Sequence, residues 1–161
     1  MRSKCPNCEK LMIAPVGPNT AKLVLVGTFP GQQEIMRGIP FCGPSGDILR
    51  SELARAGIPI GNCRITNLWQ HAKDEKGCDV KWHVNQMAKE IAGREFALLM
   101  GHDIAKALFD CGIMEISGLE MSHELFPKVR IFMSPNPADL IREPVGEFRL
   151  ALNRLTEAMN G

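Results

Sequence analysis

The sequence contains no long apolar run and no excess of charge of either sign. No stretch approaches the roughly 20 consecutive apolar residues that a membrane span requires, so a membrane-spanning protein is excluded. The first ten residues, MRSKCPNCEK, contain no apolar signal region, so we expect a cytoplasmic, intracellular protein. The formal net charge of +1 does not by itself predict nucleic-acid binding, although it allows a local basic patch.

The six cysteines occur without an export signal, which indicates reduced thiols or metal ligands and not disulfides. Cys5 and Cys8 form a C-x-x-C pair in a Pro-containing turn, which is a common half of a zinc or iron–sulfur site. Residues 1–20 are rich in Pro, Gly and Asn, and a segment of this composition is irregular unless something ties it down. We therefore expect a metal site that takes two further ligands from elsewhere in the chain.

Short apolar runs alternate with helical patterns along the chain. The apolar, β-branched runs predict buried strands at residues 22–27, 63–69, 95–101 and 128–134. The amphipathic patterns predict helices at residues 47–56, 79–92, 102–111 and 147–160. This alternation predicts an α/β fold, a three-layer α/β/α sandwich with a central, largely parallel four-stranded sheet. Residues 1–161 are expected to form a single domain.

Polar and unusual residues gather after the predicted strands. The segments in question are GTFPG, TNLWQ, MGH and SPNP. Ligands of parallel α/β sheets bind beyond the carboxyl ends of the strands. These segments are therefore expected to meet at one pocket.

Five motifs follow one another in the chain. They are GTFPGQQE (27–34), GIPFCGPSG (38–46), ITN (65–67), LMGHDIAKAL (99–108) and SPNPADLIR (134–142). Their order and spacing resemble those of the uracil-DNA glycosylase superfamily, especially its iron–sulfur branch, family 4. The resemblance implies a protein that binds DNA, single- or double-stranded, and reads a flipped base in a pocket.

Phe41 and Asn67 are the candidates for reading the base. The flat ring of Phe41 stands in a Gly-rich turn, where it can stack on a base or, alternatively, plug the turn onto the core. The amide of Asn67 offers a donor and an acceptor to the O4 and N3–H edge of uracil, and the alternative is an Asn that closes a turn. With Phe41 in the position that matches the family, we favour base recognition. Phe29 is expected to narrow the same pocket.

The same resemblance supplies candidates for contacts with the DNA backbone and stack. Gly43, Ser45 and Gly46 stand at a predicted helix N-terminus, whose N–H groups can hold a DNA phosphate or form a plain capping turn. Arg142 is a candidate phosphate contact, with a solvated surface arginine as the alternative. Leu140 is a candidate apolar wedge that fills the gap left by a flipped base.

The catalytic positions depart from the family pattern. Thr28 stands where the family has a Glu, Phe29 where the best-known branch has an Asp, and Ser134 where the last motif has a His. Thr28 can still orient a water, Ser134 can donate a hydrogen bond, and Glu34 or Asp47 can supply a carboxylate from another direction. Since general-base and oxyanion-type contributions are each worth roughly 10²–10⁴-fold, we expect weak cleavage of uracil or none.

The resemblance also implies the remaining metal ligands. His71 stands where the family has its third cysteine, and Cys78 or His83 is expected to provide the fourth ligand beside Cys5 and Cys8. We expect an iron–sulfur cluster of the 4Fe–4S type in this site. Zinc is the alternative, because a Cys₃His or Cys₂His₂ set suits Zn²⁺ at least as well.

Two functions of different classes follow from these residues. The first is a uracil-DNA glycosylase-like protein that binds a flipped base and hydrolyses its N-glycosidic bond in DNA repair. The alternative is a non-catalytic nucleic-acid or protein-binding module that kept the glycosylase fold. A metal- or redox-sensing protein, which rests on the Cys and His residues alone, is a weaker third interpretation. A monomer is expected, and no protein partner is indicated.

Overall fold

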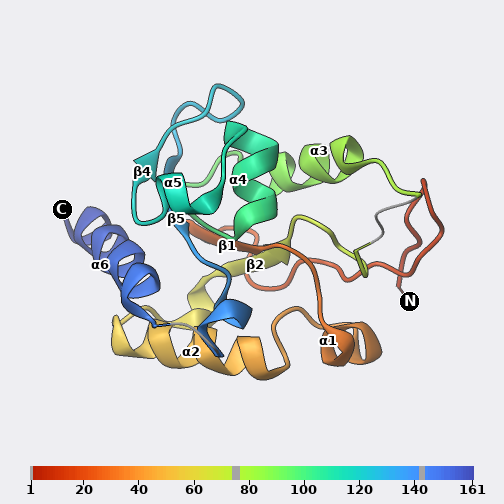
Figure 1. Ribbon diagram of the computed structural model, residues 1–161, viewed down its shortest axis with the longest axis horizontal. Coiled ribbons are helices and arrows are strands. Elements are labelled where there is room, and N and C mark those ends of the chain that lie inside the picture. The colour runs from red at the N-terminus through yellow and green to blue at the C-terminus, as the bar shows by residue number, and fades with distance from the viewer. Residues whose placement is uncertain (1, 74–76, 142–143) are drawn as a thin grey trace.

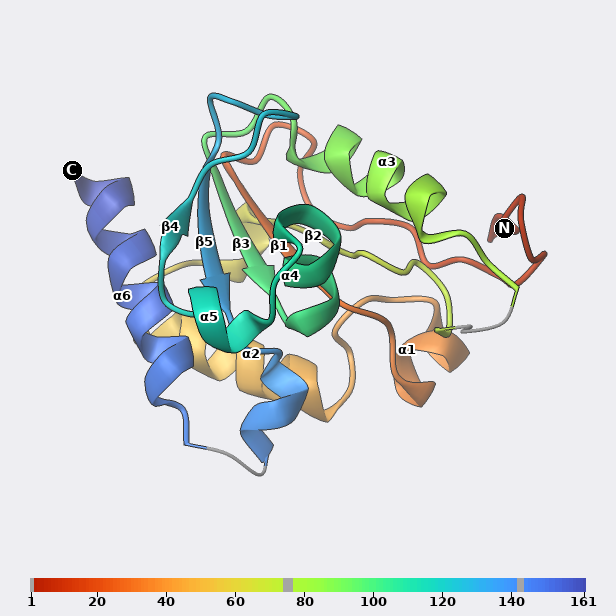
Figure 2. The ribbon, with the colours of Figure 1, turned by 45° about the horizontal axis from the view of Figure 1, so that its top comes forward.

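A five-stranded sheet forms the centre of the computed structural model, which describes residues 2–73, 77–141 and 144–161. The strands lie in the order β2-β1-β3-β5-β4. The parallel strands are β1 (Leu23–Gly27), β2 (Arg64–Asn67), β3 (Phe96–Met100) and β5 (Arg130–Ser134). The short strand β4 (Glu120–Met121) pairs with β5 in the antiparallel direction and closes one edge (Figure 2).

The predicted parallel sheet is confirmed, but the predicted number of four strands is wrong. Each predicted strand agrees with an observed parallel strand to within two residues at either end. The fifth strand, β4, has only two residues and no apolar run that could signal it in the sequence. It is a strand because it pairs with Ile131 and Phe132 of β5, which is a tertiary contact.

Helices cover both faces of the sheet. The described residues form α1 (Gln32–Arg37), α2 (Pro44–Arg55), α3 (Val80–Ile91), α4 (His102–Phe109), α5 (Ile113–Ile116) and α6 (Gly146–Asn160), with 3₁₀ helices at Ile60–Asn62 and Pro137–Ile141. Figure 1 shows α3 and α4 on one side of the sheet and α2 and α6 on the other, which confirms the predicted α/β/α sandwich. Within the described part of the chain, no helix is long and apolar enough to cross a membrane.

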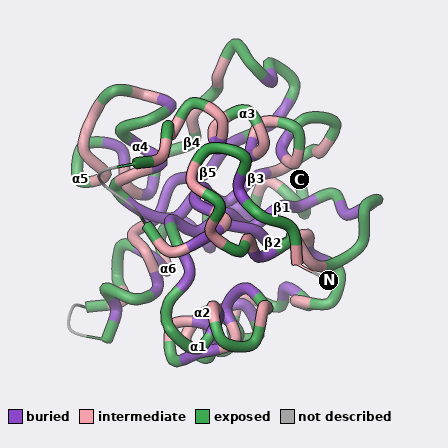
Figure 3. The backbone as a smooth tube through the Cα atoms, turned by 90° about the vertical axis from the view of Figure 1, so that its right-hand side faces the viewer, coloured by how far each residue is buried: buried purple, intermediate pink, exposed green. Residues whose placement is uncertain are grey.

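Strand β1 shows why the sheet is buried on both faces. Leu23 and Leu25 pack into the hydrophobic core shared with α2 and α6. Val24 and Val26 point the opposite way, into the core shared with α3 and α4, because side chains alternate along a strand. A strand that is apolar at every position therefore requires helices on both sides. Figure 3 shows this central layer as the buried part of the backbone.

The ends of two helices follow from their capping residues. Helix α2 begins at Pro44 with Gly43 as its N-cap, three residues before the predicted start at residue 47. Proline is favoured at the first helical position because its missing N–H group would have no partner there. Helix α3, predicted at residues 79–92, is capped by Asp79, whose side chain accepts a hydrogen bond of 2.9 Å from the backbone N–H two residues later.

The N-terminal segment is more ordered than its composition predicts. An isolated antiparallel bridge joins Lys4 to Leu11, and a second bridge joins Val16 to Ile65 of β2. The first bridge closes a tight hairpin that contains the C-x-x-C pair. The second adds the segment to the free edge of β2.

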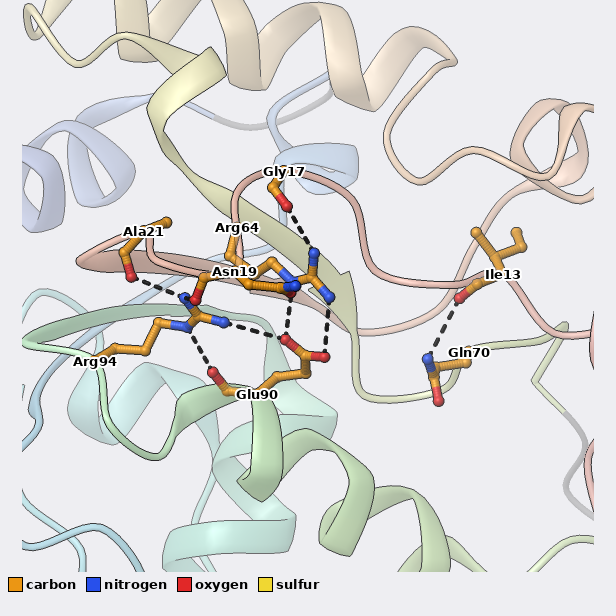
Figure 4. A network of polar contacts seen from close by, with 8 residues as sticks. All are labelled: Ile13, Gly17, Asn19, Ala21, Arg64, Gln70, Glu90 and Arg94. Carbon is orange, nitrogen blue, oxygen red and sulfur yellow. Dashed lines mark hydrogen bonds and ion pairs between the residues drawn. The ribbon is translucent and has the colours of Figure 1, made fainter.

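Two arginines and one glutamate hold this segment against β2 and α3, as Figure 4 shows. Arg64 and Arg94 both bind the Glu90 carboxylate, at 2.9 Å and 3.3 Å. Their remaining donors bind backbone carbonyl groups of the segment, those of Gly17, Asn19 and Ala21, at 2.6–2.8 Å. The network compensates three partly buried charges and the otherwise unpaired carbonyl groups at the same time.

Candidate functional site

The loops after β1, β2 and β5 enclose a small cavity of about 110 Å³ at the carboxyl edge of the sheet. It is lined by Phe29, Pro30, Gly31, Glu34, Phe41, Ser45, Asn67, Asn136 and Ala138. The segments expected to converge, GTFPG, TNLWQ and SPNP, therefore all reach it. The fourth, MGH, lies directly behind, because a Cβ atom on Gly101 would lie 2.6 Å from Cγ2 of Thr28.

A larger cavity of about 580 Å³ lies at the opposite edge of the sheet. Its lining comes from residues 92–96 and 125–130, at the amino ends of β3 and β5. Open α/β sheets bind their ligands at the carboxyl ends of the strands, so size alone does not make this cavity the functional site. The smaller cavity has the position and the convergent polar groups that a binding site needs.

Phe41 and Asn67 lie side by side on Gly27. A Cβ atom at Gly27 would lie 2.4 Å from Cζ of Phe41 and 2.5 Å from Oδ1 of Asn67, so only glycine leaves room for both. The Phe41 ring is 5% exposed and belongs to the hydrophobic core, yet one part of it lines the cavity. The two sequence interpretations of Phe41, core plug and base platform, are thus compatible in one side chain.

The backbone of Phe41 is held in a left-handed conformation, with φ at 54°. Its carbonyl oxygen accepts a hydrogen bond of 2.6 Å from the Arg50 guanidinium. A Cβ atom on Gly46 would lie 1.8 Å from the same oxygen, so Gly46 permits the close approach of the loop to α2. A non-glycine residue keeps such a conformation only where its surroundings determine it, and these contacts fix the ring beside the cavity.

Glu34 supplies the carboxylate of the cavity. It lies in the first turn of α1 and is 5% exposed. Its Oε2 atom would lie 3.3 Å from a Cβ atom on Gly31 and 3.1 Å from one on Gly43, so these two glycines leave space for the carboxylate. The other candidate carboxylate, Asp47, is exposed and paired with Arg50 at 3.5 Å, and it does not line the cavity.

The two hydroxyl groups predicted at the catalytic positions are both engaged by the protein. Thr28 is buried, and its Oγ1 accepts a short hydrogen bond from Nδ2 of Asn136. Ser134 is fully buried, and its hydroxyl donates to the carbonyl oxygen of Pro135 at 3.1 Å. Neither residue lines the cavity; Asn136 does. Because Thr28 accepts from Asn136, its own proton remains available for donation.

One aromatic ring of the cavity lining has a cation beside it. Phe29 lines the cavity and is 47% exposed, so part of its ring faces solvent. The Nζ atom of Lys73 lies 5.9 Å from the centre of the Phe29 ring. Lys73 is held there by an ion pair of 3.0 Å with Asp103 of α4. A half-exposed ring beside a fixed cation suits an anionic, aromatic ligand such as a nucleotide.

Among the described candidates for contacts with the DNA backbone and the base stack, some line the cavity and others pack inside the protein. Ser45 lines the cavity, whereas Gly43 and Gly46 serve the packing of Glu34 and Phe41. Leu140 is 8% exposed and packs into the core, while the next residue, Ile141, is 59% exposed. Arg142 lies outside the described residues.

The candidate metal ligands meet at one point. The ligand atoms of Cys5, His71, Cys78 and His83 all lie within 4.8 Å of one another. Sγ of Cys78 lies 3.6 Å from Sγ of Cys5, 3.5 Å from Nε2 of His71 and 3.3 Å from Nε2 of His83. Sγ of Cys8 stands at the edge of this group, 3.4 Å from Nε2 of His71. The sequence presented Cys78 and His83 as alternatives, and the structure brings both to the centre.

Neighbouring groups prepare the two imidazoles for binding. Nδ1 of His71 donates to the carbonyl oxygen of Ala72 at 2.7 Å, which directs Nε2 toward the cysteines. His83 is fully buried, and its Nδ1 has no partner among the described residues. Burial, and then the neighbouring His71, lower the pKa of His83 to about 4, so the imidazole is neutral at physiological pH. A neutral imidazole is the form that binds a metal.

The pKa values of the two central thiols are shifted in opposite directions. Burial opposes ionisation of Cys5, but hydrogen bonds from the backbone N–H groups of Asn7 and Cys8 and from the side chains of Cys78 and Cys8 together lower the pKa of this thiol. Burial, and then the neighbouring Cys5 and Cys8, raise the pKa of Cys78 to about 12. Two adjacent thiolates repel each other, and a bound cation removes this penalty.

Sequence comparison assigns the chain to a family. The sequence model of the Uracil DNA glycosylase superfamily matches residues 14–158 of this chain. The chain belongs to the uracil DNA glycosylase superfamily. A Type-4 uracil-DNA glycosylase of Archaeoglobus fulgidus is 40% identical to it over 53 residues, which is 33% of this chain and 27% of that protein. The aligned segment thus spans only about a quarter of the curated relative.

The polar residues that line the cavity differ from those that the family motifs indicate. The resemblance directs attention to Thr28 and Ser134, the positions of the missing Glu and His. In the structure, Asn136 and Glu34 are the polar groups that reach the cavity from the same two loops. Asn136 was missed, although its place after a strand end, in SPNP, is the same signal that singled out Asn67 in TNLWQ.

Proposed function

We propose that this member of the superfamily binds a flipped base of DNA in the cavity beside Gly27 and hydrolyses its N-glycosidic bond slowly. The observation that supports this most strongly is the fixed pair of Phe41 and Asn67 at the carboxyl edge of the sheet. At about 110 Å³, the cavity is far smaller than the roughly 300–1,000 Å³ of sites for drug-sized ligands. It suits one small planar group and not a whole nucleotide.

Recognition follows from the two side chains. The face of Phe41 offers a stacking surface worth about 1–3 kcal/mol per base. The Asn67 amide offers one acceptor and two donors, which match the N3–H and O4 groups of uracil. Phe29, which lines the cavity, and Lys73 beside its ring would contact the nucleotides next to the flipped base.

The chemistry assigned to the cavity is weaker than in a relative with the family Glu and His. Cleavage builds positive charge on the sugar and negative charge on the leaving base. Among the described residues that line the cavity, Glu34 is the only acid, so we assign it the attacking water or the charge on the sugar. No imidazole is among the described residues that line the cavity, so none stabilises the leaving base, and electrostatic stabilisation of this kind contributes about 10²–10³-fold.

A second function is favoured by one observation. Thr28 and Ser134 are buried and neither lines the cavity, so neither hydroxyl group reaches a ligand there. A protein that binds the base without cutting it would have this arrangement. In that case the protein is a non-catalytic DNA-binding module of the same fold.

Single-turnover release of uracil separates the two functions. Single-stranded and duplex oligonucleotides with one uracil are incubated with the protein and then treated with alkali, which breaks the strand at abasic sites. We expect slow release by the wild type and a further loss of about 10²–10⁴-fold in Glu34→Gln. Asp47→Asn, which removes the rival and exposed carboxylate, is the matched control and should keep the wild-type rate.

The outcomes of this experiment are distinct. Equal rates for Glu34→Gln and the wild type would contradict the role of Glu34. Binding without any release would support the second function. Absence of both release and binding would contradict the proposal that the cavity receives a DNA base.

The metal centre has a separate role in this proposal. None of its candidate ligands lines the cavity, so we assign it to fixing the N-terminal hairpin against the loop that leads into α3. The branch that the chain resembles implies a 4Fe–4S cluster here. The spacing of the ligand atoms indicates which metal fits the centre.

A further inference from the structure

We propose that Cys5, His71, Cys78 and His83 hold a single Zn²⁺ ion in place of the iron–sulfur cluster that the family 4 resemblance implies. The proposal concerns only these residues and their surroundings, and it does not depend on the proposed activity. Three observations support it. They are the spacing of the ligand atoms, the pattern of contacts between cysteines and histidines, and the hydrogen bonding and burial of the two imidazoles.

The spacing matches the edges of one tetrahedron. With Zn–S bonds of about 2.3 Å and Zn–N bonds of about 2.0–2.1 Å, tetrahedral geometry places neighbouring ligand atoms about 3.3–3.8 Å apart. The Sγ atoms of Cys5 and Cys78 are 3.6 Å apart. The contacts between these sulfur atoms and the Nε2 atoms of the histidines measure 3.3, 3.5 and 3.7 Å. These are four of the six separations in the group, and all four ligand atoms lie within 4.8 Å of one another, as atoms that surround one ion must.

A four-iron cluster does not fit between the same atoms. In such a cluster each cysteine binds a different iron, so two ligand atoms are separated by the body of the cluster and by two metal–ligand bonds. Ligand atoms of a cluster therefore cannot touch one another. Here Cys5 and Cys78 are at contact distance, which leaves no room for a cluster between them.

A two-iron cluster with mixed ligands is excluded by the contact pattern. In a Cys₂His₂ cluster of that type, both histidines bind one iron and both cysteines bind the other. Each cysteine would then be remote from each histidine. In this protein Cys78 contacts both His71 and His83, at 3.5 and 3.3 Å, and Cys5 contacts His83.

The chemistry of the ligand set agrees with zinc. Two thiolates and two neutral imidazoles in tetrahedral geometry form a closed structural zinc site. The hydrogen bond from Nδ1 of His71 to Ala72 is the outer contact that orients a metal-binding imidazole. His83, buried and without a partner at Nδ1, depends on Nε2 for compensation, and a bound ion provides it.

The proposal predicts different effects on metal binding for Cys8 and Cys5. Cys8 belongs to the C-x-x-C pair and its sulfur lies 3.4 Å from Nε2 of His71, but it is not one of the four ligand atoms that all lie within 4.8 Å of one another. Replacement of Cys8 should therefore leave the ion in place, whereas replacement of Cys5 should remove it. A site built on both cysteines of the pair would lose its metal in either variant.

The decisive measurement is the metal and sulfide content of the wild-type chain. The protein is purified without oxygen from cells supplied with both iron and zinc, so that neither metal is limiting and a cluster would survive. We expect about one zinc per chain, no acid-labile sulfide and no visible absorbance. Iron with an equivalent amount of sulfide would overturn the proposal, and so would iron without sulfide.

Variants define which residues bind the ion. Zinc content should fall below a tenth of the wild-type value in Cys5→Ser and His83→Ala, and it should be unchanged in Cys8→Ser. Cys42→Ser and Cys111→Ser, at half-buried cysteines away from the centre, are the matched controls. Zinc loss in Cys8→Ser equal to that in Cys5→Ser would overturn the set of four.

Cobalt provides a readout that does not depend on the stability of any variant. Co²⁺ added to metal-depleted wild-type protein should produce the intense visible bands of tetrahedral cobalt together with thiolate-to-cobalt absorption in the near ultraviolet. Weak bands of six-coordinate cobalt would contradict a tetrahedral site.

Discussion

At Gly27 the absence of a side chain decides where two other side chains lie. The ring of Phe41 and the amide of Asn67 occupy the space that a Cβ atom would take, and both line the cavity. The first motif of the chain therefore contributes to the site through an empty position as much as through its polar groups. Glu34 and Asn136 add the remaining polar groups from the neighbouring loops.

Replacement of Gly27 by alanine should destabilise the fold and displace the pair. The added methyl group would overlap Phe41 and Asn67, and overpacking of this kind costs about 1–3 kcal/mol. Urea unfolding measures the loss. Gly61→Ala is the matched control, because a Cβ atom at Gly61 meets nothing within 4 Å, and its effect should stay within about 0.5 kcal/mol. Equal stability of the two variants would contradict the close packing around Gly27.

Among the elements, α3 connects the N-terminal segment to the sheet. Glu90 of α3 binds Arg64 of β2 and Arg94, and the two arginines bind the carbonyl groups of the segment (Figure 4). The same helix carries His83 of the metal centre near its beginning. Two separate devices thus hold the first 20 residues in place.

Removal of the shared carboxylate should loosen the segment and destabilise the protein. Glu90→Ala leaves two partly buried arginines close together without their counter-ion, which we expect to cost about 1–3 kcal/mol. Limited proteolysis should then cut within residues 13–21 faster than in the wild type. Lys89→Ala, at the exposed neighbouring position, should change neither measurement. Unchanged proteolysis in Glu90→Ala would show that the network does not hold the segment.

The elements differ in how far sequence could predict them. Strands β1 and β3 are apolar at nearly every position, so their pattern is local and was sufficient. Strand β4 and helix α5 have two and four residues, and contacts with their neighbours determine them. The site follows the same rule. The motifs identified the loops, but only the folded chain shows that Asn136 faces the cavity and Ser134 does not.

The metal centre illustrates the limit more clearly. Sequence identified five candidate ligands; the C-x-x-C pair favoured Cys8, and His83 was only the alternative to Cys78. Which atoms converge depends on how the hairpin of residues 4–11 lies against α3, and this is a tertiary property. The type of metal depends on distances of a few tenths of an ångström, which no motif encodes.

At the scale of the whole molecule, the functional parts lie in different places. The cavity occupies the carboxyl edge of the sheet, and the metal centre joins the N-terminal hairpin to the loop before α3. We propose that the chain acts as a single domain in which the metal stabilises the N-terminal hairpin and the cavity recognises a DNA base. Phosphate contacts carry most of the affinity of proteins for DNA, whereas contacts with the base carry the selectivity.

The most direct test of the account is the base preference of binding and its dependence on Asn67. The affinity of the wild type and of Asn67→Ala is measured, at one fixed salt concentration, for oligonucleotides that differ only in carrying uracil or cytosine at one position. We predict that the wild type prefers uracil, and that Asn67→Ala binds both equally while keeping its affinity for the cytosine strand. An undiminished preference in Asn67→Ala, or no preference in the wild type, would contradict the claim that this cavity reads a base.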